Sequence, residues 1–161
     1  MSEGQAAVRA LRPDDAAAAR ALVSTCIGGT RYSARTHEVL DAALTGDDDE
    51  HVGLVLPAST DHASAGSFSG VAVLGAVAGA SGTWRLHWLF ARSIAAATPL
   101  ACAAADVARD RGARLLVGEL PDDGPYALAC DVFASTGFVL EGEVCDFVQD
   151  GIALRLWVAR F

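Results

Sequence analysis

The sequence predicts a single α/β (α+β) domain in which strands and helices alternate along 161 residues. Short runs of branched aliphatic and aromatic residues alternate with alanine-rich segments of helical periodicity, as is typical of an α/β chain. A predicted helix also joins two apolar strands, Thr83–Ala91 and Leu115–Leu120. Such a crossover connection implies that these two strands are parallel. No repeat or linker divides the chain, so we expect one domain over residues 1–161.

Turn and capping residues delimit the elements of the N-terminal half. An aspartate precedes an alanine-rich segment, which marks the start of a helix, and Gly28 and Gly29 end it. The stretch before Gly70 is rich in serine, alanine and glycine and is too polar for a regular element. We therefore expect, in order, a strand over Val8–Leu11, a helix from Asp15 to about Thr25, a helix from about Ser33 to Gly46, an acidic loop over Asp47–Glu50, a strand over His51–Leu56 and a long loop over Pro57–Gly70.

The C-terminal half contains two hairpin signals. Glycines separate the first pair of strands, and the dipeptide Asp150-Gly151 separates the last pair. Gly112 and Gly137 follow helical patterns and are expected to end them. In order, we expect a strand over Val71–Ala78, a hairpin turn over Gly79–Gly82, a strand over Thr83–Ala91, a helix over Thr98–Arg111, a strand over Leu115–Leu120, a turn over Pro121–Pro125, a helix over Tyr126–Ser135 and paired strands over Val139–Phe147 and Ile152–Phe161.

Composition argues against several classes of function. The formal net charge of −8 disfavours nucleic acid as a partner, because binding to a phosphate backbone depends on clustered positive charge. The N-terminus lacks the basic and apolar regions of a signal peptide, and glycine and serine interrupt the least charged stretch, so we expect a cytoplasmic protein without a membrane span. The four cysteines lie far apart without metal-ligand spacing, which predicts neither disulfides nor a metal site.

Several motifs resemble those of one enzyme superfamily. Residues 92–97 follow an apolar strand, as a phosphate-binding turn Arg/Gln-x-x-Gly-x-Gly/Ala does, and Val107–Leu115 ends the following helix in the same way. Gly82–Trp88, the segment from Tyr126 to Phe138, and Cys145–Gly151 also match. With the order of elements, these residues resemble the GNAT N-acetyltransferase superfamily. The resemblance implies a mixed, mostly antiparallel sheet of about seven strands, with a central parallel pair and about four flanking helices.

The resemblance implies an acyl-CoA-dependent N-acetyltransferase that acts on a small amine or amino-acid-like substrate by direct transfer with a general base. The cofactor would be acetyl-CoA, and its pyrophosphate would lie at a helix N-terminus, where unpaired amides and the helix dipole favour an anion. The end of the preceding strand would supply a backbone donor for the thioester oxygen. The residues implied for cofactor binding are Leu89, Phe90, Ala91, Arg92, Ala95, Ala96 and Ala97.

Two residues are candidates for the general base. Glu119 ends a buried strand, at the edge of the sheet where α/β proteins place ligands. His87 has an ordinary pKa near neutrality, and strict alternation would put it with Arg85 and Leu89 on one face, opposite Trp84, Leu86 and Trp88. The alternative for His87 is a structural histidine that bonds a neighbour.

Three further residues are candidates for substrate binding. Tyr126 would line the pocket, or else cap the short helix that follows it. Glu38 and Asp146 would face the substrate groove and suit a cationic amine, or else be solvated carboxylates. Arg92 likewise has the alternative of an exposed arginine at a helix start.

Two other functions stay open from sequence. In the first, the protein keeps the GNAT fold as a binding or regulatory module without acetyl-CoA chemistry. Alanine replaces the motif glycines at Ala95 and Ala97, the loop after Ala91 is shortened, and Ala134 takes the place of a tyrosine that serves as general acid. Ile94 or Phe90 would then close the cleft. In the second, the protein is a homodimeric accessory protein whose interface includes an exposed Trp157 on the C-terminal hairpin.

Overall fold

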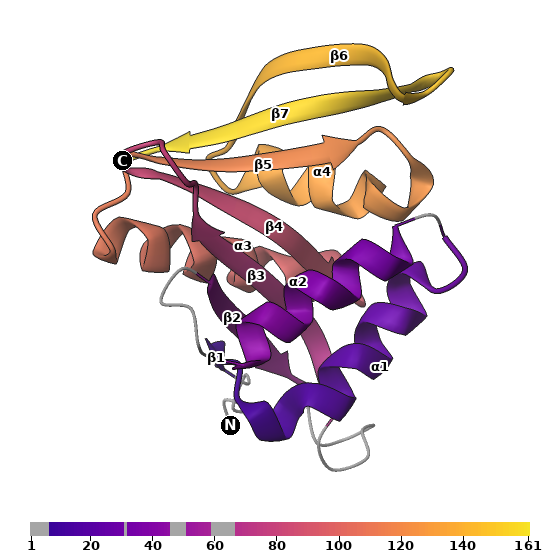
Figure 1. Ribbon diagram of the computed structural model, residues 1–161, viewed down its shortest axis with the longest axis vertical. Helices are drawn as coiled ribbons and strands as arrows, with labels where there is room; N and C mark the ends of the chain where they lie inside the picture. The colour runs from indigo at the N-terminus through magenta and orange to yellow at the C-terminus, as the bar shows by residue number, and fades with distance from the viewer. Residues whose placement is uncertain (1–6, 31, 46–50, 59–66) are drawn as a thin grey trace.

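The computed structural model describes residues 7–30, 32–45, 51–58 and 67–161. Within these residues seven strands form one sheet in the order β1-β2-β3-β4-β5-β7-β6 (Figure 1). The strands are β1 (Arg9–Ala10), β2 (His51–Pro57), β3 (Phe68–Ala76), β4 (Thr83–Ala91), β5 (Leu115–Pro121), β6 (Val139–Gln149) and β7 (Ile152–Arg160). The helices are α1 (Ala16–Ile27), α2 (Ser33–Thr45), α3 (Ile94–Asp110) and α4 (Ala127–Ser135), with short 3₁₀ turns η1 (Pro13–Asp15) and η2 (Gly124–Tyr126).

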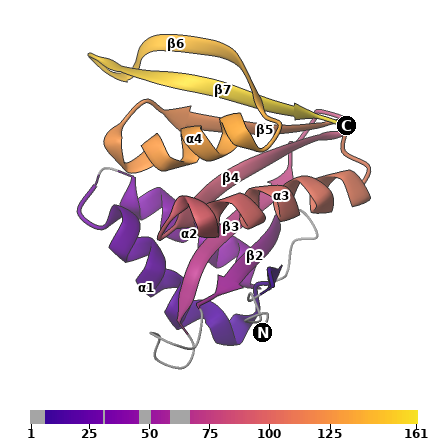
Figure 2. The same cartoon turned by 180° about the vertical axis from the view of Figure 1, so that it is seen from behind.

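The sheet is mixed and has helices on both faces. All neighbouring strands are antiparallel except β4 and β5, which are parallel and joined through α3. Figure 1 shows α1 and α2 in front of β2, β3 and β4, and Figure 2 shows α3 and α4 on the opposite face. The predicted fold class is therefore confirmed, including the central parallel pair and the four helices.

Two element boundaries differ from prediction by more than two residues. Helix α3 begins at Ile94 rather than Thr98, because Ser93 caps it and an alanine-rich first turn outweighs the proline inside the helix. Strand β3 begins at Phe68, within the predicted loop, because pairing with β2 and β4 on both sides stabilises it. The acidic loop predicted over Asp47–Glu50 lies outside the described residues, as does most of the loop predicted over Pro57–Gly70.

Strand β4 contains a bulge at His87. On β3, Leu74 pairs with Leu86 and Val73 with Trp88, so His87 is an extra residue. The prediction of strict alternation along β4 was therefore wrong beyond Leu86. Leu89 lies on the same face as Leu86, because their partners on β3 are Ala72 and Leu74, two residues apart. Trp88 moves to the opposite face, where its ring stacks on Phe90.

Strands β4 and β5 separate after four paired residues. Their parallel pairing runs from Thr83–Leu115 to Leu86–Gly118 and ends there. Beyond that point, Glu119–Pro121 pair only with β7. We call the gap between Trp88–Ala91 of β4 and Glu119–Pro121 of β5 the fork. Backbone groups of β4 that point toward β5 have no strand partner in the fork.

The C-terminal hairpin packs one aromatic residue inside and leaves an apolar surface outside. Trp157 is only 8% exposed and lies edge-on to Phe133, so the expectation that it is an exposed interface residue was wrong. Its position on β7, between β5 and β6, places it against α4 rather than at the sheet edge. The large exposed apolar side chains of the hairpin lie mainly on β6: Val139, Leu140, Val144 and Phe147.

Candidate active site

A cavity of about 480 Å³ opens at the fork, on the face of the sheet that carries α1 and α2. It gathers three of the predicted site residues: His87 from the β4 bulge, Glu119 from β5, and Tyr126 from the turn before α4. Side chains from α2, β2, β7 and the end of β6 complete its walls. The remaining lining residues are Tyr32, Arg35, Val39, His51, Arg85, Leu86, Trp88, Pro121, Phe147 and Leu154.

Glu119 is paired with Arg85 at the mouth of the cavity. The Arg85 guanidinium donates to the Glu119 carboxylate at 3.1 Å, and the Glu119 side chain is 37% exposed. The two residues lie on adjacent strands at the point where β4 and β5 separate. The carboxylate is thus held in place while it remains accessible from solvent and from the cavity.

His87 lies beside His51, with ring centroids 5.2 Å apart. Burial lowers the pKa of His87 to about 4, and the neighbouring His51, Arg85 and Arg35 add to this lowering. The His87 imidazole is therefore neutral at physiological pH. A neutral imidazole offers one nitrogen as a hydrogen-bond acceptor, so His87 can orient or deprotonate a bound group without adding positive charge.

Acidification is expected to destabilise the protein through His87. The unfolded chain binds a proton near pH 6.5 and the folded chain only near pH 4, so stability is lost as the pH falls through this window. We expect wild type to lose about 2 kcal/mol more than His87→Asn between about pH 7 and about pH 4.5. Urea denaturation at both pH values measures the difference, and an equal loss in both proteins would contradict the assignment.

Four aromatic rings form a continuous series along the cavity and the fork. Tyr32 meets Tyr126 edge-on at 4.9 Å, Tyr126 approaches Phe90 at 6.4 Å, and Phe90 stacks on Trp88 at 5.7 Å. The Tyr32 hydroxyl donates to Asp123 at 3.2 Å. Burial, together with Tyr32 and Asp123, raises the pKa of Tyr126, so its hydroxyl keeps its proton. Phe90 and Tyr126 come from opposite sides of the fork and meet across it.

The cavity concentrates buried polar atoms that have no hydrogen-bond partner among the described residues. These atoms are His51 Nδ1, Arg85 Nε, Trp88 Nε1 and Tyr126 Oη, and all four residues line the cavity. Tyr126 is only 3% exposed. A buried polar atom without a partner costs about 1–3 kcal/mol, and four of the six such atoms found among the described residues belong to residues of this cavity.

Two predicted substrate residues lie elsewhere. Glu38 is exposed on α2 and Asp146 on β6, and neither lines the cavity. The Asp146 carboxylate accepts a hydrogen bond from the Gly151 amide in the β6–β7 turn at 2.7 Å. The backbone of Asp146 has a positive φ of 55°. Arg35 and His51 line the cavity instead. Nothing in the local sequence distinguishes them, since only long-range packing brings them to β4.

The predicted phosphate-binding residues form the first turn of α3. Only Arg92 and Ser93 separate β4 from this helix. The Ser93 side chain and carbonyl accept from the Ala96 amide, and the carbonyl also accepts from the Ala97 amide. The first-turn amides that remain for an anion are those of Ile94 and Ala95. Ala95 is exposed, whereas Ala96 and Ala97 are buried.

Arg92 is anchored to β3 and exposed at the head of α3. Its amide donates to the Ser69 carbonyl at 2.9 Å, and its Nε donates to the Phe68 carbonyl at 3.1 Å. Ile94 is 49% exposed, so it does not close the fork.

Ala134 was expected to take the place of a tyrosine that serves as general acid, and this choice of position was wrong. Ala134 is exposed on α4, so a tyrosine there would point to solvent. The α4 side chain that reaches the fork is Phe133, whose ring lies against Gly118 where β4–β5 pairing ends. A Cβ at Gly118 would overlap this ring. The position next to the fork thus holds an aromatic ring without a hydroxyl.

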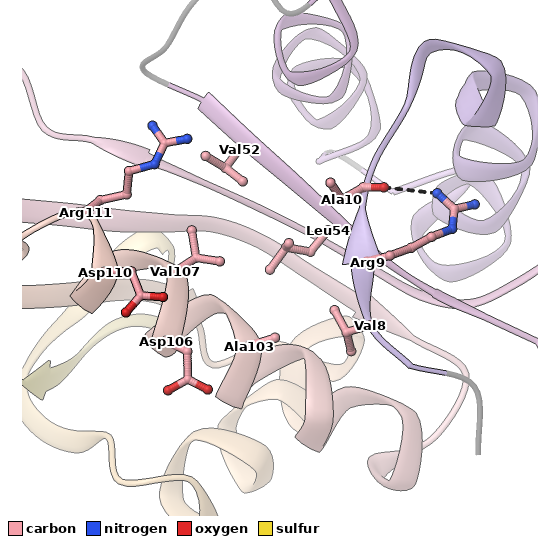
Figure 3. Close-up of a pocket in the computed structure, with 10 residues that line it drawn as sticks. All are labelled: Val8, Arg9, Ala10, Val52, Leu54, Ala103, Asp106, Val107, Asp110 and Arg111. Carbon is pink, nitrogen blue, oxygen red and sulfur yellow. Dashed lines mark hydrogen bonds between the residues drawn. The ribbon is translucent and has the colours of Figure 1, made fainter. Parts of the chain in front are cut away.

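A second cavity, of about 520 Å³, lies between α3 and strands β1 and β2 (Figure 3). Apolar side chains, including Val52, Leu54 and Val107, form its floor. Two of its charged groups are ion-paired: Arg9 with Asp15 at 2.7 Å, and Asp106 with Arg109 at 2.8 Å. None of the unpartnered buried atoms found among the described residues lies in it. The cavity at the fork is therefore the better candidate for a site.

Comparison with solved structures identifies the fold. A protein assigned to the GNAT family of acetyltransferases from Desulfovibrio desulfuricans superposes with a TM-score of 0.77 at 21% identity, over 96% of this chain and 98% of its own. The chain has the GNAT fold. A ribosomal-protein-alanine N-acetyltransferase from Brucella melitensis, also of GNAT fold by this superposition, matches with a TM-score of 0.72 at 17% identity, over 96% and 99% of the two chains.

A third match to the GNAT fold has a ligand bound. It is a protein assigned as a streptothricin acetyltransferase from Bacillus anthracis, in complex with acetyl coenzyme A. Its TM-score is 0.59 at 12% identity, over 75% of this chain and 67% of its own. No protein-family model and no curated protein matches the sequence. Among the described helices, none is both long and apolar enough to cross a membrane.

Proposed function

We propose that the protein is an acyl-CoA-dependent N-acyltransferase that acts on a small amine or amino-acid-like substrate. The observation that carries this proposal is the cavity at the fork, where His87, Glu119 and Tyr126 lie together at the end of β4–β5 pairing. The fold supports it, because the matched solved structures are acetyltransferases acting on different substrates. A cytoplasmic location is part of the same proposal.

Glu119 and His87 are the proposed catalytic residues. An ammonium group must lose a proton before its nitrogen can attack a carbonyl carbon. Glu119 is the proposed base, directly or through one water, and Arg85 fixes its carboxylate at the mouth of the cavity. The neutral His87 accepts a second hydrogen bond from the amine, and the Tyr126 hydroxyl donates to the substrate within the cavity.

The cofactor would be held by the fork and the head of α3. Acetyl-CoA, when bound, supplies the acyl group as an activated thioester. Leu89, Phe90 and Ala91 are proposed to contact the acyl end, because the side of β4 turned toward β5 lacks a strand partner there. Arg92 and the first turn of α3, Ala95–Ala97, are proposed to hold the pyrophosphate through the guanidinium, two free amides and the helix dipole.

A binding or regulatory protein without acetyl transfer is the second candidate, and two contacts favour it. The rings of Phe90 and Tyr126 meet across the fork at 6.4 Å, as expected of a closed cleft. Ser93 also caps α3 itself and occupies the Ala96 and Ala97 amides. Both contacts would compete with a thioester and a pyrophosphate for the same space and donors.

Titration calorimetry with acetyl-CoA separates the two candidates. We expect saturable binding to wild type and binding weaker by about tenfold or more to Arg92→Ala, because a hydrogen bond to a charged group contributes about 1.5–3 kcal/mol. Arg20→Ala, which removes an exposed ion pair with Asp41, is the control and should bind like wild type. Absence of binding at millimolar acetyl-CoA would favour the second candidate.

Homodimer formation remains a separate proposal. The exposed apolar side chains of β6, which is an edge strand, form the surface that a second copy would use. Light scattering coupled to size-exclusion chromatography tests this, and a monomer at high concentration would count against it.

A further inference from the structure

The cavity at the fork carries an excess of positive charge. Its charged lining residues are Arg35, Arg85 and Glu119. Glu119 is already paired with Arg85, and no ion pair joins Arg35 to a carboxylate among the described residues. The local balance is therefore one uncompensated arginine, in a protein whose formal net charge is −8. An arginine at the wall of a partly enclosed cavity attracts an anionic group.

Two other observations support positive potential inside the cavity. The neighbouring His51, Arg85 and Arg35 all lower the pKa of His87, so both arginines act on the same interior. Three of the unpartnered buried atoms belong to groups that donate hydrogen bonds: Arg85 Nε, Trp88 Nε1 and Tyr126 Oη. These donors are closed to solvent in the cavity, so a ligand rich in oxygen lone pairs reaches them only when the surrounding side chains move.

The remaining walls are apolar and aromatic. Trp88, Phe147 and Leu154 come from three different strands, and Val39 comes from α2. A volume of about 480 Å³ exceeds what one small amine needs, so a carbon skeleton with its own apolar surface can be buried there. The site thus combines an anion-binding arginine, a carboxylate for an amine and an apolar chamber.

We propose that the cavity selects amines that carry a carboxylate on an apolar or aromatic skeleton, which is the class of apolar α-amino acids. Arg35 binds the carboxylate, Glu119 binds the amino group and the aromatic walls bury the side chain. This inference rests on the proposed function, since it names the substrate class of the same site. It also replaces the expectation of a cationic substrate, because Glu38 and Asp146 lie outside the cavity.

Matched substrate pairs test the assignment. Acetyl transfer is measured for phenylalanine and leucine, each against its decarboxylated amine, phenethylamine or isoamylamine. For wild type we expect kcat/KM about tenfold or more higher for the amino acids. Arg35→Gln should abolish this preference chiefly through KM, Arg35→Lys should retain part of it, and Arg20→Gln should behave like wild type. Equal rates for amino acids and decarboxylated amines would overturn the inference while leaving the proposed function intact.

Direct binding keeps the two proposals distinguishable if no transfer occurs. Calorimetry with phenylalanine and leucine, in the absence of acetyl-CoA, is compared with phenethylamine and isoamylamine for wild type and Arg35→Gln. Binding of the amino acids that depends on Arg35 supports carboxylate recognition whatever the fate of the acyltransferase proposal. Failure of both amino acids to bind and to react overturns it, even if acetyl-CoA binds.

Discussion

Replacing Phe133 by alanine is expected to lower the free energy of unfolding by about 3–5 kcal/mol. Phe133 is 1% exposed and stacks on Phe138 with ring centroids 4.3 Å apart. Its ring also meets the Trp157 ring edge-on at 6.2 Å and lies against Gly118, and a Cβ at Gly118 would overlap it. Removing the ring would leave a cavity that links α4 to the centre of the sheet.

Urea denaturation measures this loss, and Phe147→Ala is the matched control. Phe147 is exposed on β6, so the same change there should cost less than about 1 kcal/mol. An unchanged dependence on urea concentration in both variants would indicate that only stability has changed. If Phe133→Ala proves no more costly than Phe147→Ala, the packing of α4 on β5 described above is incorrect.

Glu119→Gln is expected to reduce kcat/KM for acetyl transfer by about 10²–10⁴-fold, the range typical of a lost general base. Glutamine keeps the size of the side chain and can still accept from Arg85, but it cannot take a proton from an ammonium group. Rates measured across a pH range should show that the loss shrinks at high pH, where the amine is already deprotonated.

The control for this variant is Glu143→Gln. Glu143 is an exposed carboxylate paired with Arg155 at 2.8 Å, and it lies outside the cavity. Exposed ion pairs contribute only about 0–1 kcal/mol, so neither substitution should change stability appreciably. A fall of less than about tenfold in Glu119→Gln, or an equal fall in Glu143→Gln, would remove Glu119 from the proposed mechanism.

The sequence was sufficient for the element order because periodicity and turn residues act locally. The parallel pair followed from one crossover. Of the residues that line the cavity, Glu119 was predicted from its place at the end of a strand and His87 from its ordinary pKa near neutrality. The predicted start of α3 was four residues late, because Ser93 is the residue that caps the helix. Local signals therefore predicted the helix itself but not its first turn.

The parts of the site that could not be predicted depend on contacts between distant segments. The bulge at His87 exists only in the register between β3 and β4, and no residue type marks it in the chain. Arg35 and His51 reach the cavity from α2 and from the start of β2. Glu38, three residues after Arg35 on the same helix, does not line the cavity.

The extra residue in β4 reverses the alternation of side chains between the two faces of the sheet. Before the bulge, even-numbered side chains such as Leu86 lie on one face of the sheet, and after it odd-numbered ones such as Leu89 lie on that same face. The two halves of the strand therefore alternate in opposite senses. The first half pairs with β5. In the second half, Trp88 and Phe90 stack on each other beside the fork. Sequence change in relatives should follow one parity up to Leu86 and the opposite parity from Trp88, with one extra residue retained at the position of His87.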